Sequence, residues 1–417
     1  MKLKYGKEEI RLPIEDKNII KILNLEKQEV LLNPENKLRE LLKNPIDCPS
    51  LKDLIIQKNA KKILIIVNDI TRPTPYEVIL PPLLDELHQI GIKKENIIFI
   101  IATGIHRSNS QEEIKEMFGE NIFSAYKFIN HNCDNPHLKD LGEMKSGNKL
   151  WVDPIISDID FIITTGVIVP HYFAGFSGGR KSILPGISGR RTIEGNHSNM
   201  VHPNARSGNL KDNPVHQEMQ EAAEKVGVDF NINVVTNEHH EIIEIVAGGL
   251  YKSWLKGVEV CKKTYLCSIK QKADIVIASA GGYPKDINVY QAQKALDNAY
   301  QAVKPGGTII LLAECSEGYG EETFEKWIEE ANTPDDIINR LQEKFVLGGH
   351  KAHGIARIVK EVEVILISFL PPDKVRKLFF IPMENISQAI EYIKDKYGED
   401  FQAYILPSGN TVVPQIG

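Results

Sequence analysis

Residues 62–73 read KILIIVNDITRP. The run at 63–67 is short, apolar and rich in β-branched residues, which is typical of a strand buried on both faces of a parallel sheet. Pro73 stops such a strand, because proline disfavours regular structure at the residue before it and has no N–H to donate. The polar side chains of Asp69 and Arg72 therefore gather at the carboxyl end of the predicted strand.

Two more apolar runs repeat this pattern. Residues 96–102 lead into Thr103-Gly104-Ile105-His106-Arg107, and residues 160–165 open directly into a glycine-rich stretch. A helix predicted at 76–90 connects the first two strands. Ligands of open α/β sheets bind beyond the carboxyl ends of the strands. We therefore expect the three turns to converge on one crevice.

A second α/β unit begins at Ala273–Ser279, ADIVIAS. Further strands are predicted at 308–312 and 362–369, with helices between them. At 417 residues the chain exceeds what a single hydrophobic core usually covers. The fold class expected is α/β, with two α/β domains, mostly parallel sheets, and the active site in the cleft between the domains.

The predicted domain boundaries follow from these units. Residues 1–270 form an N-terminal cofactor-binding domain, to which 398–417 return, and 271–397 form a C-terminal Rossmann-like domain. The first fifty residues are expected at an edge of the N-terminal domain.

Composition excludes several classes of protein. A net charge of −6 without a long basic run gives no attraction to nucleic acid. No apolar run approaches the roughly 18 residues of a membrane span, and the charged N-terminus lacks a signal peptide's apolar core. Five scattered cysteines argue against disulfides and thiolate zinc sites. These features indicate a cytoplasmic protein whose partner is a small molecule.

The glycine-rich stretch at 166–197 reads GVIVPHYFAGFSGGRKSILPGISGRRTIEGNH. Glycines beside cations let backbone N–H groups approach an anion, so Ser177, Gly178 and Gly179 are candidate phosphate ligands. A P-loop is excluded because Arg180 stands where its last glycine belongs. The Rossmann fingerprint G-x-G-x-x-G is also absent after the first strand. Composition thus indicates an anion site that is neither a P-loop nor a Rossmann loop.

Several polar residues are candidates for chemistry. The candidate histidines are His106, His171 and His197: two that face a substrate can each exchange a proton near neutral pH, and a third could bind a metal through one nitrogen. Arg72 can grip a carboxylate with two N–H groups. Gln291 and Lys294 are three residues apart on one helix face, which suits a carboxylate but is more often a solvated surface.

Five blocks, taken together and in order, resemble the nickel-dependent lactate racemase family. They are DITRP, TGIHR, PHY through SGGRK, GNH and YQxxK, spanning Asp69 to Lys294. No key position departs from the family pattern.

The resemblance implies a nickel-pincer nucleotide, a pyridinium-3-thioamide-5-thiocarboxylic acid mononucleotide that chelates nickel through two sulfurs and a ring carbon. In the family one arm is joined to a lysine, matching Lys181, and a histidine that completes the coordination matches His197. Asp69 matches a residue that contacts the nucleotide. Cofactor maturation enzymes are implied partners, and protein made without them stays in the apo form.

The paired catalytic histidines of the family match His106 and His171. Its substrate-anchoring residues match Arg72, Tyr290, Gln291 and Lys294. The implied activity is a lactate racemase that removes a hydride and returns it through a pyruvate-like intermediate.

Two alternatives stay open at this point. The same cofactor serves a racemase or epimerase of another 2-hydroxy acid equally well, because the anchors read only the carboxylate. A nucleotide-binding kinase or binding module that uses the glycine-rich loop is the alternative from a different class.

Overall fold

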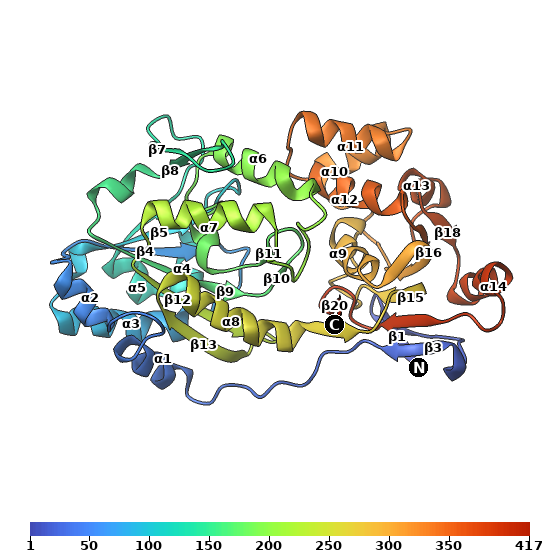
Figure 1. Cartoon of the computed structure of the whole chain (residues 1–417), viewed down its shortest axis with the longest axis horizontal. Helices are drawn as coiled ribbons and strands as arrows, with labels where there is room; N and C mark the ends of the chain where they lie inside the picture. Colours follow the sequence, from blue (N-terminus) through green and yellow to red (C-terminus); the bar gives the residue numbers. More distant parts are fainter. The chain divides into compact units, whose positions relative to one another are not determined.

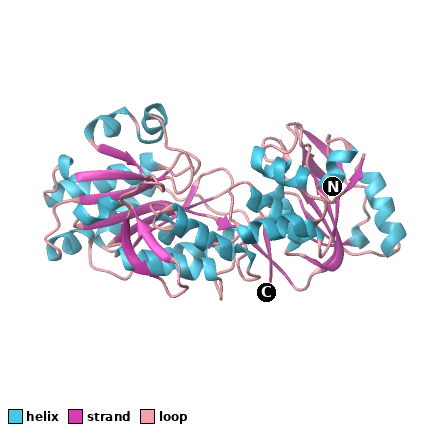
Figure 2. Ribbon diagram, turned by 90° about the horizontal axis from the view of Figure 1, so that it is seen from above, coloured by secondary structure: helices cyan, strands magenta, loops and turns pink.

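The computed structural model describes all residues 1–417, and they divide into two compact units (Figure 1). One unit comprises residues 27–264, and the other comprises 1–26 together with 265–417. Each unit is built on a six-stranded sheet, and Figure 2 shows helices on both sides of the strands in each. The predicted α/β class is confirmed.

In the unit of residues 27–264 the strand order is β13-β12-β9-β4-β5-β6. All neighbours are parallel except β12 and β13. The strands are β4 (Ile63–Asn68), β5 (Ile97–Ala102), β6 (Lys127–Asn130), β9 (Phe161–Ile168), β12 (Phe230–Thr236) and β13 (Ile242–Gly248). The strands predicted at 62–68, 96–102 and 160–165 are thus confirmed as three adjacent strands.

Helices cover this sheet, and two separate hairpins accompany it. The helices are α1 (Pro34–Lys43), α2 (Leu51–Gln57), α3 (Tyr76–Ile90), α4 (Gln111–Phe118), α5 (Glu120–Ala125), α6 (Arg190–Ser198), α7 (Pro214–Val226) and α8 (Leu250–Tyr265). The hairpins are β7 (Lys139–Glu143) with β8 (Lys149–Val152), and β10 (Pro170–His171) with β11 (Gly175–Phe176). A core of fully buried side chains joins β4 and β5 to α1 and α3.

The other unit has the strand order β18-β17-β16-β15-β19-β3, all parallel. Its strands are β3 (Ile19–Ile22), β15 (Ala273–Ser279), β16 (Val303–Leu312), β17 (Glu363–Ile367), β18 (Ile381–Met383) and β19 (Ala403–Leu406). Smaller pairs are β1 (Lys2–Tyr5) with β2 (Glu8–Arg11), and β14 (Leu266–Ile269) with β20 (Val413–Ile416).

Six helices accompany this second sheet. They are α9 (Val289–Tyr300), α10 (Glu322–Glu330), α11 (Pro334–Glu343), α12 (Gly349–Val359), α13 (Pro372–Lys377) and α14 (Ile386–Tyr397). Asn288 caps α9 by accepting a hydrogen bond from the N–H of Gln291 at 2.9 Å. This cap fixes where α9 begins and therefore which residues stand in its first turn.

The structure differs from the expected domain boundaries at both ends of the chain. The first 26 residues belong with 265–417, since β3 pairs with β19 rather than with the N-terminal sheet. Residues 398–417 stay in the same unit, because β19 lies between β3 and β15. Leu3 and Leu12 are buried in the core of that sheet. Short strands such as β3 carry too few apolar residues to reveal a partner so distant in sequence.

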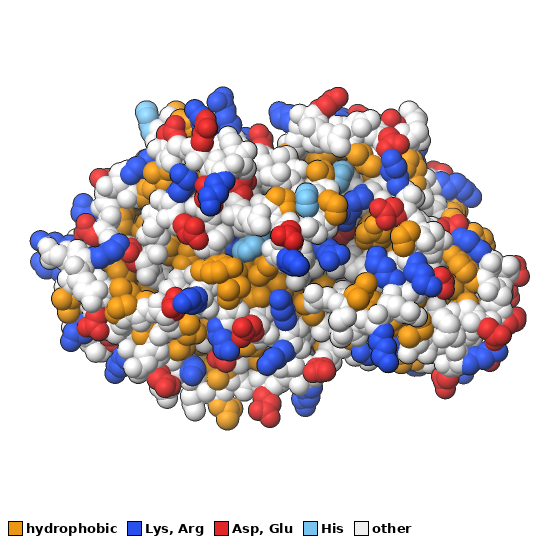
Figure 3. Space-filling model, viewed as in Figure 1, with side chains coloured by type: hydrophobic (Ala, Val, Ile, Leu, Met, Phe, Trp, Pro, Cys, Tyr) orange, Lys and Arg blue, Asp and Glu red, His pale blue; other side chains and the backbone are white.

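No helix is both long enough and apolar enough to cross a membrane. On the face drawn in Figure 3, basic and acidic side chains are interspersed rather than gathered in a stripe of one sign. This distribution agrees with the modest net charge of −6.

The placement of the N-terminus can be tested with Leu3→Ala. Truncating this buried side chain should destabilise its unit by about 2–5 kcal/mol and speed amide exchange in β15 and β19. Hydrogen-exchange mass spectrometry should find β4 and β9 unchanged. Leu38→Ala, in the other core, should give the reverse pattern. Faster exchange of β4 and β9 in Leu3→Ala would contradict the assignment.

Candidate functional site

The turns after three adjacent strands meet at one edge of the N-terminal sheet. Asn68 of β4 is in register with Ala102 of β5, so the turns that follow start side by side. The N–H of Gly104, after β5, donates to the carbonyl of Gly186 in the glycine-rich stretch at 3.0 Å. The predicted convergence of these turns is confirmed.

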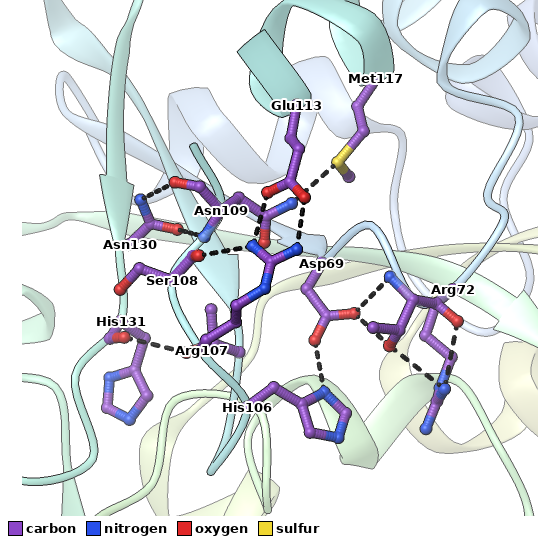
Figure 4. A network of polar contacts seen from close by, with 12 residues as sticks. Asp69, Arg72, His106, Arg107, Ser108, Asn109, Glu113, Met117, Asn130 and His131 are labelled. Atoms are coloured by element: carbon purple, nitrogen blue, oxygen red, sulfur yellow. Dashed lines mark hydrogen bonds and ion pairs between the residues drawn. The ribbon is translucent and has the colours of Figure 1, made fainter. Parts of the chain in front are cut away.

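The turns after β4 and β5 are joined by a short bond between Asp69 and His106. The Nδ1 of His106 lies 2.6 Å from Oδ2 of Asp69 (Figure 4). The other carboxylate oxygen accepts bonds from the N–H of Thr71 at 3.0 Å and from its hydroxyl at 2.6 Å. Asp69 is buried, with 4% of its side chain exposed, whereas 34% of the His106 side chain is exposed.

This arrangement sets the charge of Asp69 and the tautomer of a neutral His106. Burial raises the pKa of Asp69, but the hydrogen bonds from His106 and Thr71 outweigh it, so the pKa of this carboxyl ends below its usual value. An ionised Asp69 only accepts, so Nδ1 of His106 must donate. The Nε2 of a neutral His106 is then left with its lone pair, as a general base requires.

The loop that carries His106 is fixed from the next helix. Arg107 forms a two-pronged ion pair with Glu113, at 2.8 and 2.5 Å. Glu113 also closes a capping box with Ser110 at the start of α4. Figure 4 shows Arg107 turned toward α4 while His106 faces Asp69.

Arg180 organises the glycine-rich stretch from inside. It is fully buried and donates to the carbonyls of Ala174 at 2.7 Å and Phe176 at 2.8 Å. Its Nε donates to Nδ1 of His216 at 3.1 Å, and its guanidinium lies 3.9 Å from the centre of the Trp254 ring. Burial lowers the pKa of Arg180 to about 9.

The local structure itself requires a glycine at position 179 and uses the hydroxyl of Ser177. A Cβ on Gly179, whose φ is +52°, would lie 2.8 Å from the Trp254 ring, and the Gly179 N–H donates to Asn233 at 2.9 Å. The Ser177 hydroxyl donates to the carbonyl of Val167 at 2.7 Å and accepts the N–H of Val169 at 2.9 Å. These groups hold the loop onto β9 and β12, so the hydroxyl of Ser177 and the N–H of Gly179 are already engaged within the protein.

His171 lies in the β10–β11 hairpin among aromatic rings. Its ring stacks near Tyr172, with centroids 5.2 Å apart, and meets Phe173 edge-on at 4.6 Å. The N–H of Ala174 donates to its Nδ1 at 3.3 Å, which places the proton of a neutral ring on Nε2. Burial and then the charge of Lys181 lower the pKa of His171 well below its usual value.

Lys181 occupies the 3₁₀ turn Gly179–Ser182 that follows the loop. Burial, followed by the positive charges of Arg72 and Arg180, lowers the pKa of its amine well below the usual value. The amine lies 5.8 Å from the centre of the Phe173 ring. A neutral lysine amine is a nucleophile, which an ordinary surface lysine is not.

His197 reaches the same place from the last turn of α6. Its ring meets Phe173 edge-on at 4.9 Å, as the ring of His171 does at 4.6 Å. Asn196 donates to Glu218 of α7 at 2.6 Å, and a Cβ on Gly195 would lie 2.7 Å from Asn148. The Gly-Asn-His sequence is thus explained by one close approach and one inter-helix bond, which together orient His197.

Other buried histidines have internal roles. His131 bonds Asp153 at 2.9 Å and the carbonyl of Ser188 at 2.9 Å, and His216 accepts from Arg180. No group of three or more His, Cys, Asp or Glu side chains in the chain is arranged to hold a metal ion. A protein-only metal cage is therefore not what this site offers.

The remaining predicted residues lie on α9 in the other unit. Gln291 and Lys294 are both exposed on one face, as their spacing predicts. Tyr290 is more buried, with its ring edge-on to Phe324 at 5.7 Å, and burial raises its pKa to about 12.

The sequence reasoning missed two aromatic residues that shape the site. Phe173 contacts the rings of His171 and His197 and lies near the Lys181 amine. Trp254, from α8, packs on Arg180 and donates to the carbonyl of Ser177 at 2.8 Å. An aromatic residue inside a polar glycine-rich stretch was the available signal for Phe173, whereas Trp254 is too distant in sequence to have given one.

The role of Arg180 can be tested with Arg180→Met. The change leaves buried carbonyls without donors, at about 1–3 kcal/mol for each lost partner, so the melting temperature should fall by several degrees. Arg191→Met, an exposed neighbour, should leave it unchanged. Equal melting temperatures for the two variants, measured by circular dichroism, would contradict this role.

Comparisons with known proteins identify the family of the chain. The model of the lactate racemase N-terminal domain matches residues 5–208, and that of the lactate racemase C-terminal domain matches 269–414. The chain is 36% identical to a lactate racemase of Thermoanaerobacterium thermosaccharolyticum, covering 99% of this chain and 98% of that protein. It is 33% identical to a lactate racemase of Lactiplantibacillus plantarum, with the same coverage of both.

Solved structures give the same answer. The lactate racemase apoprotein of T. thermosaccharolyticum matches with a TM-score of 0.89 and 34% identity, over 100% of this chain and 99% of that one. A Thermotoga maritima protein matches with a TM-score of 0.63 at 20% identity, over 94% of this chain and 100% of that one, and so shares the fold. By its sequence and its fold, the chain belongs to the lactate racemase family.

Proposed function

We propose that this protein interconverts D- and L-lactate, by removing the C2 hydride and returning it to the opposite face of a bound pyruvate-like intermediate. The observation that supports the proposal is that His171, His197 and Lys181 surround one ring, that of Phe173. Arg72, whose charge acts on His171 and Lys181, follows the Asp69 that holds His106. The names of the two curated relatives, both lactate racemases over nearly their whole length, support the proposal.

The residues at this site fit a covalently held nickel-pincer nucleotide. An amine that is to form an amide-type bond must be uncharged, and the lowered pKa of Lys181 meets that need. The cations that act on Lys181 are Arg72 and Arg180, so the surroundings favour an anionic group such as a nucleotide phosphate. We assign the tether to Lys181.

His197 fits the metal. An imidazole is a good donor to nickel(II), and a cofactor that brings its own sulfur and carbon donors needs only one side chain from the protein. That requirement agrees with the lack of a three-residue metal cage. When bound, the cofactor would supply a site that accepts a hydride and gives it back.

A hydride route suits this substrate. Removing the α-proton of lactate would place negative charge beside a carboxylate, whereas removing a hydride leaves a stable 2-keto acid. The hydroxyl must lose its proton as the hydride leaves, so the site needs a base for each enantiomer. His106 takes this proton at Nε2, and the ionised Asp69 stabilises the imidazolium that forms.

His171 serves the other enantiomer. Its neutral ring carries the proton on Nε2, and its lowered pKa keeps the ring neutral at physiological pH. The two rings therefore rest in complementary states, with His106 presenting a lone pair and His171 presenting an N–H. A neutral imidazole N–H is too weak an acid to give up its proton, so His171 must exchange the 3.3 Å bond from Ala174 for the Nδ1–H tautomer before its Nε2 can accept the hydroxyl proton of the other enantiomer.

The substrate carboxylate is assigned to Arg72, Gln291 and Lys294. The keto acid must stay bound while it turns its other face to the hydride, which makes the carboxylate anchor necessary in both directions. We further propose that the protein works in the cytoplasm, where maturation enzymes load the cofactor.

The proposal is tested on protein co-produced with the maturation enzymes. The loaded enzyme should racemise lactate, contain nickel and carry added mass on the peptide of Lys181. Lys181→Ala should lack the added mass and the activity. A fully active, unmodified Lys181→Ala variant would contradict the assignment of the covalent attachment to Lys181.

The histidine pair is tested with Asp69→Asn. One carboxamide cannot accept from both Thr71 and His106, and an NH₂ facing Nδ1 forces the proton of His106 onto Nε2. We expect kcat to fall on the order of 10²-fold or more, because replacing the aspartate that fixes the tautomer of a catalytic histidine has a large effect in serine proteases. The added mass at Lys181 should be retained.

The matched controls are His106→Ala and His171→Ala, each of which should abolish interconversion. A wild-type rate in either variant would refute the two-base assignment. A wild-type rate in Asp69→Asn would instead remove Asp69 from the mechanism.

A second candidate is racemisation of another short 2-hydroxy acid with the same cofactor. The only observation that favours it is the choice of substrate-binding residues. Arg72 and Lys294 would bind the carboxylate of the substrate and make no contact that distinguishes the rest of the 2-hydroxy acid. Relative kcat/KM values over a panel of 2-hydroxy acids decide between the two.

A further inference from the structure

A lysine on α12 is bound to the first turn of α9. The Nζ of Lys351 donates to the carbonyl of Tyr290 at 2.5 Å and lies 4.0 Å from the centre of the Tyr290 ring. Helices α9 and α12 pack against each other. Lys351 therefore holds both the backbone and the ring of Tyr290.

Tyr290 is also fixed from its other sides. Its N–H donates to the carbonyl of Tyr319 at 3.0 Å, and its ring meets Phe324 edge-on. Gln291 and Lys294 follow in the same two turns of α9, so the position of Tyr290 determines where those two side chains project.

The ammonium group of Lys351 also interacts with charged side chains of α9. Burial, then the positive charge of Lys294, lowers the pKa of Lys351 to about 8, while Asp297 opposes the shift. Asp297 is itself shared with Arg357, whose guanidinium lies 3.8 Å away. The carboxylate of Asp297 thus faces two cations, Lys351 and Arg357. The positive charge of Lys294 acts on Lys351 as well.

Lys294 is exposed and Lys351 is half-buried, and a small anion beside the two ammonium groups would reduce the repulsion between them. A small carboxylate is the anion already assigned to Lys294. Packing alone would not require the α12 residue at this position to be charged.

We infer that Lys351 is a positioning residue for substrate binding, which sets the first turn of α9 through Tyr290 and adds a second positive charge beside Lys294 for a small carboxylate. This inference rests on the proposed function, since it gives a partner to the same anchor.

The test compares Lys351→Met with Lys351→Arg in the loaded enzyme. Methionine keeps most of the length and removes the charge, so KM for lactate should rise on the order of tenfold, with a smaller change in kcat. Arginine keeps the charge and the donor, so its KM should stay within about threefold of wild type. Added mass at Lys181 should be equal in all of them.

Lys360→Met is the matched control. Lys360 follows the last turn of α12, where it pairs with the exposed Asp335, so its KM should equal that of wild type. Unchanged KM in Lys351→Met overturns the inference. Equal losses in Lys351→Met and Lys351→Arg, together with lowered melting temperatures, also overturn it, because the role would then be structural.

Pyruvate binding separates this inference from the proposed function. Calorimetry with pyruvate needs no turnover, and it should show weaker binding to Lys351→Met than to wild type. If wild type binds pyruvate but does not racemise lactate, the proposed function fails while the role of Lys351 stands. If wild type binds no pyruvate, the inference fails.

Discussion

A single buried guanidinium determines the geometry of the candidate site. Arg180 gathers the carbonyls of Ala174, Phe176 and Gly178, which lie in and beside the β10–β11 hairpin. This hairpin carries His171, and the turn of Arg180 itself carries Lys181. The acceptors are carbonyl dipoles and a neutral imidazole, with the Trp254 ring on one face. Burying this charge without a carboxylate leaves it free to act on its neighbours.

That charge also tunes the chemistry. It contributes to the lowered pKa of Lys181, His171 and His216. Burial is the larger cause of these shifts and the charge of Arg180 adds to it, so the same residue shapes the loop and helps to keep the nearby amine and imidazoles neutral. A carboxylate partner for Arg180 would have removed its contribution to these shifts while preserving the bonds that hold the loop.

The sequence predicted what is local and repeated. The apolar runs at 62–68, 96–102 and 160–165 became β4, β5 and β9, and their polar ends met at one edge. The N-terminal residues could not be placed, because the pairing of β3 with β19 spans almost the entire chain and rests on backbone hydrogen bonds that any sequence can make. Likewise, the DITRP and TGIHR blocks pointed to Asp69 and His106 separately, while the bond between them follows only from the register of β4 and β5.

The N-terminal placement has a consequence for biosynthesis. A ribosome that adds about 5–20 residues per second needs roughly 20–75 s between β3 and its partner β19. Residues 27–264 are contiguous and can fold during that interval, while β3 waits with Ile20 and Ile22 on an unpaired edge. An exposed edge strand is a site of aggregation. The N-terminal segment around β3 is therefore the part of the nascent chain most prone to aggregation. A chaperone that binds segments soon after they leave the ribosome would have its greatest effect there.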